Sequence, residues 1–256
     1  MNGDIAAATP DISMSFGLIV MVFAAGLAGA FIQSVTGFGY GILLMSILPL
    51  FVPNLLITVA ASGIIGTIQA VISAWRYRKS TQWKFLPPLM GCFFVTSFLA
   101  IRFAATNSVD VLRRPLGAFL IILAAYFIFF AGKIKIKGSP VAGCVTGCIA
   151  GIAGGFFSIS GPPAVVYLLS ATSSNAAYMA TLQAFFSCAG IYSATVRFAN
   201  GLITYSVLMI TVPALIGLVI GATLGAKLFD KLDPMWLRRL VYTVMLVSGL
   251  SILITG

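Results

Sequence analysis

Long apolar runs separated by short polar connections dominate the chain. Three runs cover roughly 54–75, 85–104 and 112–131, and three more cover roughly 175–196, 203–226 and 236–255. About 20 apolar residues in a helix cross a hydrocarbon core roughly 30 Å thick, so each run is expected to form one membrane-spanning helix. Asn54 and Asn175, at the starts of equivalent runs, are typical helix-capping residues.

Two further apolar stretches, 16–52 and 140–171, are too long for a single span and are interrupted in the middle. The first contains GFGYG, from Gly37 to Gly41, and the second contains SISGPP, from Ser158 to Pro163. Glycine and proline interrupt helices, and proline is tolerated in the first turn of a new one. Each stretch is therefore predicted to form two helices, arranged either as a full hairpin or as a re-entrant pair.

The interrupted stretches open two copies of one pattern. Arg76 recurs as Arg197, 121 positions later (197 − 76), and the Leu-Arg-Arg triplet at 112–114 recurs at 237–239, 125 positions later (237 − 112). Duplicated halves of this kind build many secondary transporters. The predicted fold is an all-α polytopic membrane protein with two inverted-topology repeats. Each repeat opens with a broken or hairpin helix pair, which three transmembrane helices follow.

The composition agrees with a membrane protein. Hydrophobic residues make up 60% of the 256 positions and charged residues 8%, whereas soluble domains carry roughly a quarter charged residues. No Lys or Arg precedes Arg76, so the amino terminus lacks the basic region of a cleaved signal peptide. The net charge of +10 comes mostly from bases at the ends of apolar runs, which indicates topology signals in a lipid bilayer and not a nucleic-acid surface.

The distribution of these bases predicts how the chain crosses the membrane. With the amino terminus outside and inverted halves, 4 of the 15 Lys and Arg lie outside and 15 − 4 = 11 lie in the cytoplasm; parallel halves would divide them 8 to 7. The positive-inside bias favours inverted halves in a bacterial-type inner membrane, with both termini extracytoplasmic. The expected divisions are an outer tail over 1–15, repeats over 16–132 and 140–256, and a basic cytoplasmic linker over 133–139.

The available side chains exclude most catalytic chemistry. The chain has no histidine, and its five acidic residues are aspartates in termini or short loops. Proton relays and sodium sites in membranes usually use Asp, Glu or His inside the bundle. Because hydrolase, kinase and metal-ligand patterns are also missing, we expect no enzymatic activity, no cofactor and no metal site.

The two interruptions predict an anion site. A helix that begins in mid-membrane directs unpaired backbone N–H groups and the positive end of its dipole at a ligand. The competing interpretation is tight helix packing, which we favour for Gly26, Gly29, Gly143, Gly147 and Gly151. The candidate substrate-binding residues are Gln33, Ser34, Thr36, Gly37, Phe38, Gly39, Tyr40, Gly41, Ser158, Ser160, Gly161, Pro162, Pro163 and Gln183.

For two further pairs of polar residues, the sequence allows two interpretations each. Arg76 and Arg197, at the ends of matched spans, are candidates for interfacial anchors or for vestibule residues that attract the anion. Gln69 and Gln183 lie inside spans, where their amides need partners either on a neighbouring helix or on the substrate.

Several motifs together resemble one known family. They are the Gly-rich broken first segment, GGFFSISGPP at 154–163, RRPLG at 113–117, and the tandem repeat. Over roughly 16–256 the chain is similar to the TauE/SafE sulfite exporter family of membrane permeases, which implies transport of sulfite, organosulfonates or other small organic anions. Export of an anion is downhill in the membrane potential, by about 2.3 kcal/mol per charge at 100 mV. We therefore expect a potential-driven uniporter that works by alternating access; the alternatives are an ion-coupled importer, an anion channel and a membrane scaffold.

Overall fold

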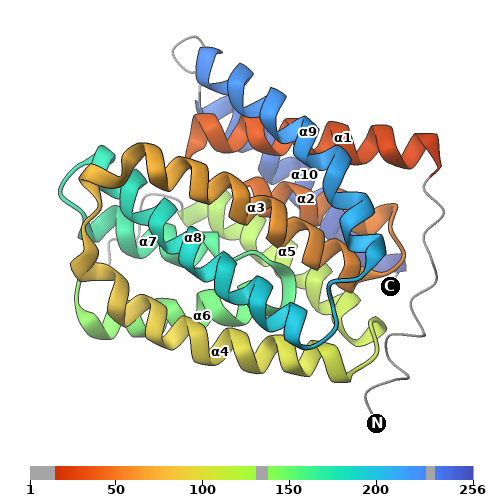
Figure 1. The fold of residues 1–256 in the computed structure, drawn as a ribbon, viewed down its shortest axis with the longest axis horizontal. Coiled ribbons are helices and arrows are strands. Elements are labelled where there is room, and N and C mark those ends of the chain that lie inside the picture. The colour runs from red at the N-terminus through yellow and green to blue at the C-terminus, as the bar shows by residue number, and fades with distance from the viewer. Residues whose placement is uncertain (1–14, 131–137, 229–233, 256) are drawn as a thin grey trace.

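The computed structural model describes residues 15–130, 138–228 and 234–255, and every regular element in these ranges is a helix (Figure 1). Each half contains one long helix, one short helix and three long helices, so the predicted all-α fold with its opening helix pairs is confirmed. The first half contains α1 (Phe16–Thr36), α2 (Tyr40–Ile47), α3 (Leu55–Tyr77), α4 (Leu86–Thr106) and α5 (Asp110–Phe130). The second half contains α6 (Pro140–Phe157), α7 (Gly161–Ala171), α8 (Asn175–Ala199), α9 (Tyr205–Leu228) and α10 (Pro234–Thr255).

Three short 3-10 turns, η2 (Leu48–Leu50), η3 (Arg78–Ser80) and η4 (Trp83–Phe85), belong to connections of the first half. The predicted tail over 1–15 and the predicted linker over 133–139 lie almost wholly outside the described residues.

The short helices cannot cross a membrane by themselves. At 1.5 Å per residue, the 8 residues of α2 and the 11 of α7 are about 12 and 17 Å long, against a hydrocarbon core of roughly 30 Å. In the first half, α2 turns back along α1: the Tyr40 N–H donates to Gln33 Oε1 at 3.2 Å, and a Cβ on Gly29 would lie 3.0 Å from Leu44 Cδ1. The chain therefore reverses direction at the first interruption, and α2 covers only part of the length of α1.

Among the described residues, six helical segments are long and apolar enough to cross a membrane; neither α8 nor α10 is one of them, although both were predicted to span. Of α10, only the shorter apolar stretch Arg239–Thr255 is identified. For α8 the reason is its buried polar side chains, Thr181, Gln183, Ser187, Ser193 and Arg197. Because these side chains are buried against neighbouring helices, they face protein and not lipid. The six segments are Phe16–Thr36, Leu55–Ser80, Trp83–Thr106, Asp110–Phe130, Pro140–Phe157 and Tyr205–Leu228.

Glycines let helices of opposite halves pack backbone to backbone. Gly147, Gly151 and Gly155 lie one helical turn apart on α6 and face the carbonyl oxygens of α4; a Cβ on Gly155 would lie 2.9 Å from the Ser97 oxygen. A second series, Gly217, Gly221 and Gly225 on α9, faces α1 in the same way. We call these two series the glycine ladders. Each ladder joins the opening helix of one half to the fourth helix of the other half.

The five glycines that were interpreted as packing residues all meet neighbouring helices closely, so that interpretation is confirmed. A Cβ on Gly26 would lie 2.5 Å from the Ala214 oxygen, and one on Gly143 would lie 3.0 Å from the Tyr167 hydroxyl oxygen. Substitutions at these positions would push helices apart.

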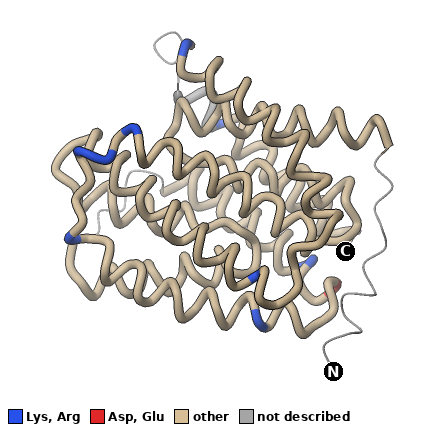
Figure 2. The backbone as a smooth tube through the Cα atoms, viewed as in Figure 1, with Lys and Arg blue, Asp and Glu red and all other residues tan. Residues whose placement is uncertain are grey.

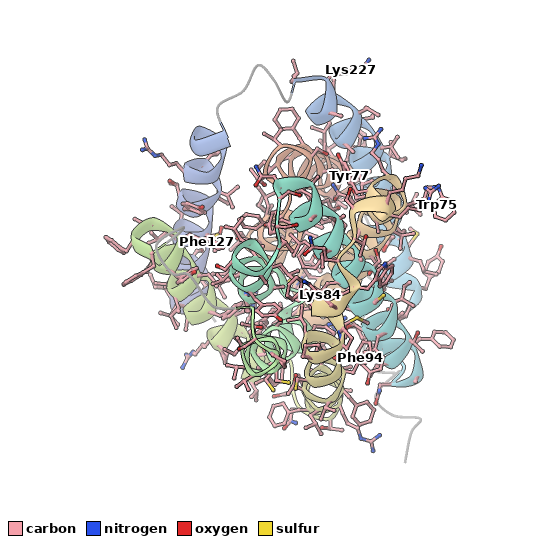
Figure 3. The ribbon with its side chains drawn as sticks, turned by 90° about the vertical axis from the view of Figure 1, so that its left-hand side faces the viewer. Trp75, Tyr77, Lys84, Phe94, Phe127 and Lys227 are labelled. Carbon is pink, nitrogen blue, oxygen red and sulfur yellow. The ribbon has the colours of Figure 1, made fainter. Side chains whose placement is uncertain are left out.

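The apolar core has two parts. The smaller part lies among α1, α2, α3 and α9, and includes Val22, Ile65 and Val207. The larger part contains residues of α4, α6, α7 and α8 and extends to α5 and α10, with one face of α2 packed against it. We call α1, α2, α3 and α9 the first bundle, and α4, α6, α7 and α8 the second bundle. Seen along the helices, α5 and α10 form a pair at one flank (Figure 3).

The helix ends agree with most of the predicted capping. Asn54 caps α3, with its side-chain oxygen accepting from the N–H groups of Leu56 and Ile57, and the Pro162–Pro163 pair lies in the first turn of α7. The prediction for Asn175 was wrong. Ser174 caps α8 instead, because its hydroxyl accepts from the Ala177 N–H at 3.2 Å, which leaves Asn175 as the first helical residue.

Candidate functional site

The two helix interruptions meet inside the protein. The first bends through Gly37 and Gly39, which have φ of 84° and 110°, and the second bends through Ser158, which has φ of 55°. A Cβ on Gly41 would lie 2.8 Å from the Ser158 carbonyl oxygen, so the start of α2 rests against the other interruption. Positive φ explains the two glycines, since residues with a Cβ rarely adopt it.

Between the interruptions lies a cavity of about 90 Å³, with residues of both bundles in its walls. On the order of 10–15 Å³ of such space holds one water molecule, so the cavity has room for several waters or one small ion. The residues that line it are Gln33, Gly39, Tyr40, Gly41, Ile42, Ser62, Gly63, Gly66, Thr67, Phe93, Gly154, Ser158, Ile159, Ser160, Gly161, Phe186, Ala189, Gly190, Ser193 and Arg197.

Arg197, in the last turn of α8, is the charged member of this lining. Only 3% of its surface is exposed, and its Nη2 donates to the carbonyl oxygens of Gly154 and Gly155, both at 2.9 Å. These carbonyls belong to the last turn of α6, where the negative end of the helix dipole favours a cation. Nε and Nη1 have no acceptor among the described residues, so part of the guanidinium remains available to a ligand.

Gly63 on α3 makes room for this side chain. A Cβ on Gly63 would lie 3.3 Å from Arg197 Nη1 and 2.9 Å from Ser158 Oγ. A larger residue at this position would therefore press on the guanidinium and on the second interruption.

Neutral donors complete the site. In the first turn of α2, the Gly41 and Ile42 N–H groups have no hydrogen-bond partner among the described residues, and the same holds for the buried Ser62 hydroxyl. Ser160 adds a half-buried hydroxyl from the second interruption. Together with Arg197, these groups are suited to hold a small anion.

The sequence pattern that defines the family described as "Sulfite exporter TauE/SafE" matches residues 22–252. The chain belongs to the TauE/SafE sulfite exporter family. It matches no curated protein and no solved structure. Because TauE/SafE proteins are membrane transporters of sulfur-containing anions, the cavity with its buried cation lies in a protein of a transporter family and not of an enzyme family.

About half of the candidate site residues line the cavity of this TauE/SafE protein: Gln33, Gly39, Tyr40, Gly41, Ser158, Ser160 and Gly161. The others do not line it. Ser34 Oγ and Thr36 Oγ1 donate to carbonyls of their own helix, at 2.8 and 2.9 Å, and Phe38 stacks on Phe127 at 5.6 Å. Pro162 and Pro163 form the first turn of α7 without contributing to the lining.

Gly37 and Gln183 instead tie the bundles together. Gln183 Nε2 on α8 donates to the Gly37 carbonyl oxygen at 3.0 Å, so its amide has a partner on the protein. At the equivalent bend of the other half, Ser158 Oγ donates to the Val59 carbonyl oxygen of α3 at 2.8 Å. We call these two hydrogen bonds the latches, because each joins one interruption to the third helix of the opposite half.

Apart from Arg197, sequence reasoning missed the residues of α3 and α8 that line the cavity. The signal was present as small residues on one helix face: Gly63, Gly66 and Thr67 on α3, and Gly190 and Ser193 on α8. Spacings of three and four residues place such residues on a common face. The same spacing also suits helix packing, so the pattern alone did not indicate a cavity.

The two matched arginines have different environments. Arg76 is exposed at the end of α3, as an interfacial anchor requires, whereas Arg197 is buried in the cavity wall. The anchor interpretation is therefore wrong for Arg197, since an anchor needs its guanidinium at the membrane surface.

Proposed function

We propose that this chain exports a small sulfur-containing anion, sulfite or an organosulfonate, by binding it in the cavity between the two helix interruptions. The main observation is the buried Arg197 guanidinium, which faces the cavity with N–H groups that no described residue accepts from. A buried cation without a carboxylate partner is costly unless an anion compensates it. Asp110 is the sole carboxylate in the part of the chain that the structure describes, and it lies at the start of α5, outside the lining.

The packing supports alternating access through movement of the two bundles. Each glycine ladder holds helices of opposite halves at backbone contact, so the halves themselves cannot separate. The cavity lies between the bundles, where α3 and α8 cross and where the latches are single hydrogen bonds. We infer that the bundles tilt about this contact, exposing the anion to one side of the membrane and then to the other.

We place the halves in inverted orientation, with both termini outside a bacterial-type inner membrane. The equivalent helices α3 and α8 run in opposite directions, since Gly63 lies near Arg197 while Thr67 lies near Gly190. The Lys and Arg gather toward the ends of helices (Figure 2). A cysteine at Lys79, on the η3 connection, should react with membrane-permeant reagents only, and one at Arg114 should also react with impermeant reagents. Outside labelling at Lys79 would reverse the orientation.

The decisive experiment measures anion binding and transport together. Purified protein is heated with a panel of sulfite, methanesulfonate, sulfate and acetate, since a ligand of the folded state raises the melting temperature. Proteoliposomes then report efflux of whichever anion binds. Arg197→Gln should weaken binding about 10- to 150-fold, the equivalent of roughly 1.5–3 kcal/mol for hydrogen bonds to a charged group. Arg76→Gln, which removes the matched but exposed charge, should change binding less than about twofold.

Two outcomes would reject the proposal. One is the absence of stabilisation by any sulfur-containing anion, and the other is equal affinity in wild type and Arg197→Gln when both are folded. The uniport part has its own test: a potassium diffusion potential set with valinomycin should drive anion efflux, whereas an imposed sodium gradient, or a proton gradient that leaves the ionisation of the substrate unchanged, should not.

One observation favours a second candidate, an importer coupled to sodium. The buried amide oxygens of Gln69 and Gln183 accept no hydrogen bond from any described residue. Such oxygens are suitable ligands for a hard cation. Anion uptake that requires sodium and is lost in Gln183→Leu would favour this candidate over the exporter.

A further inference from the structure

The charged groups around the cavity indicate how many negative charges a bound substrate can carry. Among the residues that line it, Arg197 is the charged one, and Tyr40 is the other titratable one. The remaining charged groups on the elements packed against α8 are Arg76 on α3, Arg78 and Lys79 on η3, and Arg102 on α4, all of which are exposed and outside the lining. The ligand therefore meets one full positive charge.

The helix ends do not add to this charge. Each interruption brings one carboxyl-terminal and one amino-terminal helix end to the cavity: α1 with α2, and α6 with α7. A helix end carries a partial charge of about half a unit, negative at the carboxyl end and positive at the amino end, so the two ends of each interruption largely cancel. Summed over both interruptions, the fixed charge stays near the single unit of Arg197.

The hydrogen bonds of the guanidinium agree with one ligand charge. Of its five N–H donors, both on Nη2 are used by the Gly154 and Gly155 carbonyls, which leaves three on Nε and Nη1. Because Nη2 belongs to both two-donor edges of a guanidinium, the remaining N–H groups can each donate one charge-assisted hydrogen bond to an anion, but they form no paired edge. The other free donors, such as the Gly41 N–H and the Ser62 hydroxyl, are neutral.

From this balance we infer that the cavity selects monoanions: hydrogen sulfite, or a sulfonate with one small substituent. Sulfite dianion, sulfate and sulfonates that also carry a carboxylate bring a second negative charge, which no group in the lining compensates. Burying such an uncompensated charge is strongly unfavourable. This inference rests on the proposed function, since it specifies the anion that binds beside Arg197.

The test uses the full-length purified protein and three probes. Methanesulfonate is always a monoanion, sulfate is a dianion near neutral pH, and sulfite changes from monoanion to dianion near neutral pH. Dissociation constants are measured between about pH 6 and pH 8.5, a range in which arginine stays protonated. We expect the apparent Kd for total sulfite to rise toward about tenfold per pH unit once the dianion dominates, because only the protonated form binds. The Kd for methanesulfonate should stay constant, which controls for titration of the protein, and sulfate should bind at least tenfold more weakly.

The possible results separate this inference from the proposed function. Sulfite affinity that is constant or increases with pH, or sulfate that binds as tightly as methanesulfonate, would overturn the charge selection while leaving an anion transporter. Failure of every anion to bind would overturn both. Arg76→Gln should keep the wild-type pH dependence; its loss in that variant would mean that the overall positive charge of the protein, and not Arg197, sets the selection.

Discussion

The two halves share one framework but contribute different chemistry to the site. The first half brings the α2 N–H groups and the buried Gln33; the second half brings Arg197. At the position equivalent to Gln33 the second half has a glycine, since 33 + 121 = 154. The Gln33 side chain accepts from the Tyr40 N–H, whereas the Gly154 carbonyl oxygen accepts from the Arg197 guanidinium. Matched positions of the two halves thus line one cavity with different chemistry.

The largest expected effect concerns the glycine ladders, both of which belong to the second half. Gly147→Leu or Gly221→Leu would place a side chain where the backbone of the opposite half lies, because even a Cβ at these positions overlaps a carbonyl oxygen. Overpacking of a well-packed interior costs about 1–3 kcal/mol, and contact with rigid backbone should cost at least that much. We expect loss of folded, monodisperse protein in size-exclusion chromatography. Gly91→Leu, at an exposed position with nothing within 4 Å of its Cβ, is the matched control and should fold.

The next prediction distinguishes a glycine that lines the cavity from the glycines of the two ladders. A Cβ on Gly161 would lie 3.5 Å from Phe186 Cζ, an ordinary contact, and Gly161 lines the cavity. Gly161→Leu should therefore fold but fill the site, and anion-dependent stabilisation should disappear. Gly39→Leu is a less clean test, because Gly39 has φ of 110° and any side chain there strains the backbone. Unchanged anion affinity in folded Gly161→Leu would place the site elsewhere.

Part of this architecture could be predicted from the sequence. Spans, interruptions and packing glycines followed from apolar length and from Gly and Pro positions, because bilayer thickness and backbone sterics act locally. The burial of Arg197 could not be read in this way. Arg76 occupies the same position of the repeat and is exposed, so the difference depends on the Gly154 and Gly155 carbonyls that accept from Arg197 and on Gly63 beside its Nη1, all of which are distant along the chain. The roles of Gln183 and Gly37 likewise depend on which helices pack together.

A smaller effect is expected at Gln33, the first-half residue that both caps α2 and lines the cavity. Its Oε1 accepts from the Tyr40 N–H at 3.2 Å. Gln33→Leu removes this cap, which should lower the free energy of unfolding by about 0.5–2 kcal/mol, as for other lost helix caps. Anion affinity should fall by less than in Arg197→Gln, because the α2 N–H groups lose orientation but the charge remains. Isothermal titration of both variants checks this order, and an equal loss would mean that the α2 end contributes as much as Arg197.

The smallest effect tests the hydroxyl that the second half adds to the site. Ser160 is half-buried, lines the cavity and makes no hydrogen bond to any described residue, so its hydroxyl is free to donate to a bound anion. Ser160→Ala should weaken binding by roughly 0.5–1.5 kcal/mol, the range for one hydrogen bond of a neutral donor. Since Ser160 has no partner on the protein to lose, the melting temperature without ligand should not change. Ser73→Ala, at a half-buried position of α3 outside the cavity, should leave both quantities unchanged. If Ser160→Ala binds as tightly as wild type, the Ser160 hydroxyl does not contact the anion, and Arg197, the α2 N–H groups and the other hydroxyls of the lining hold it.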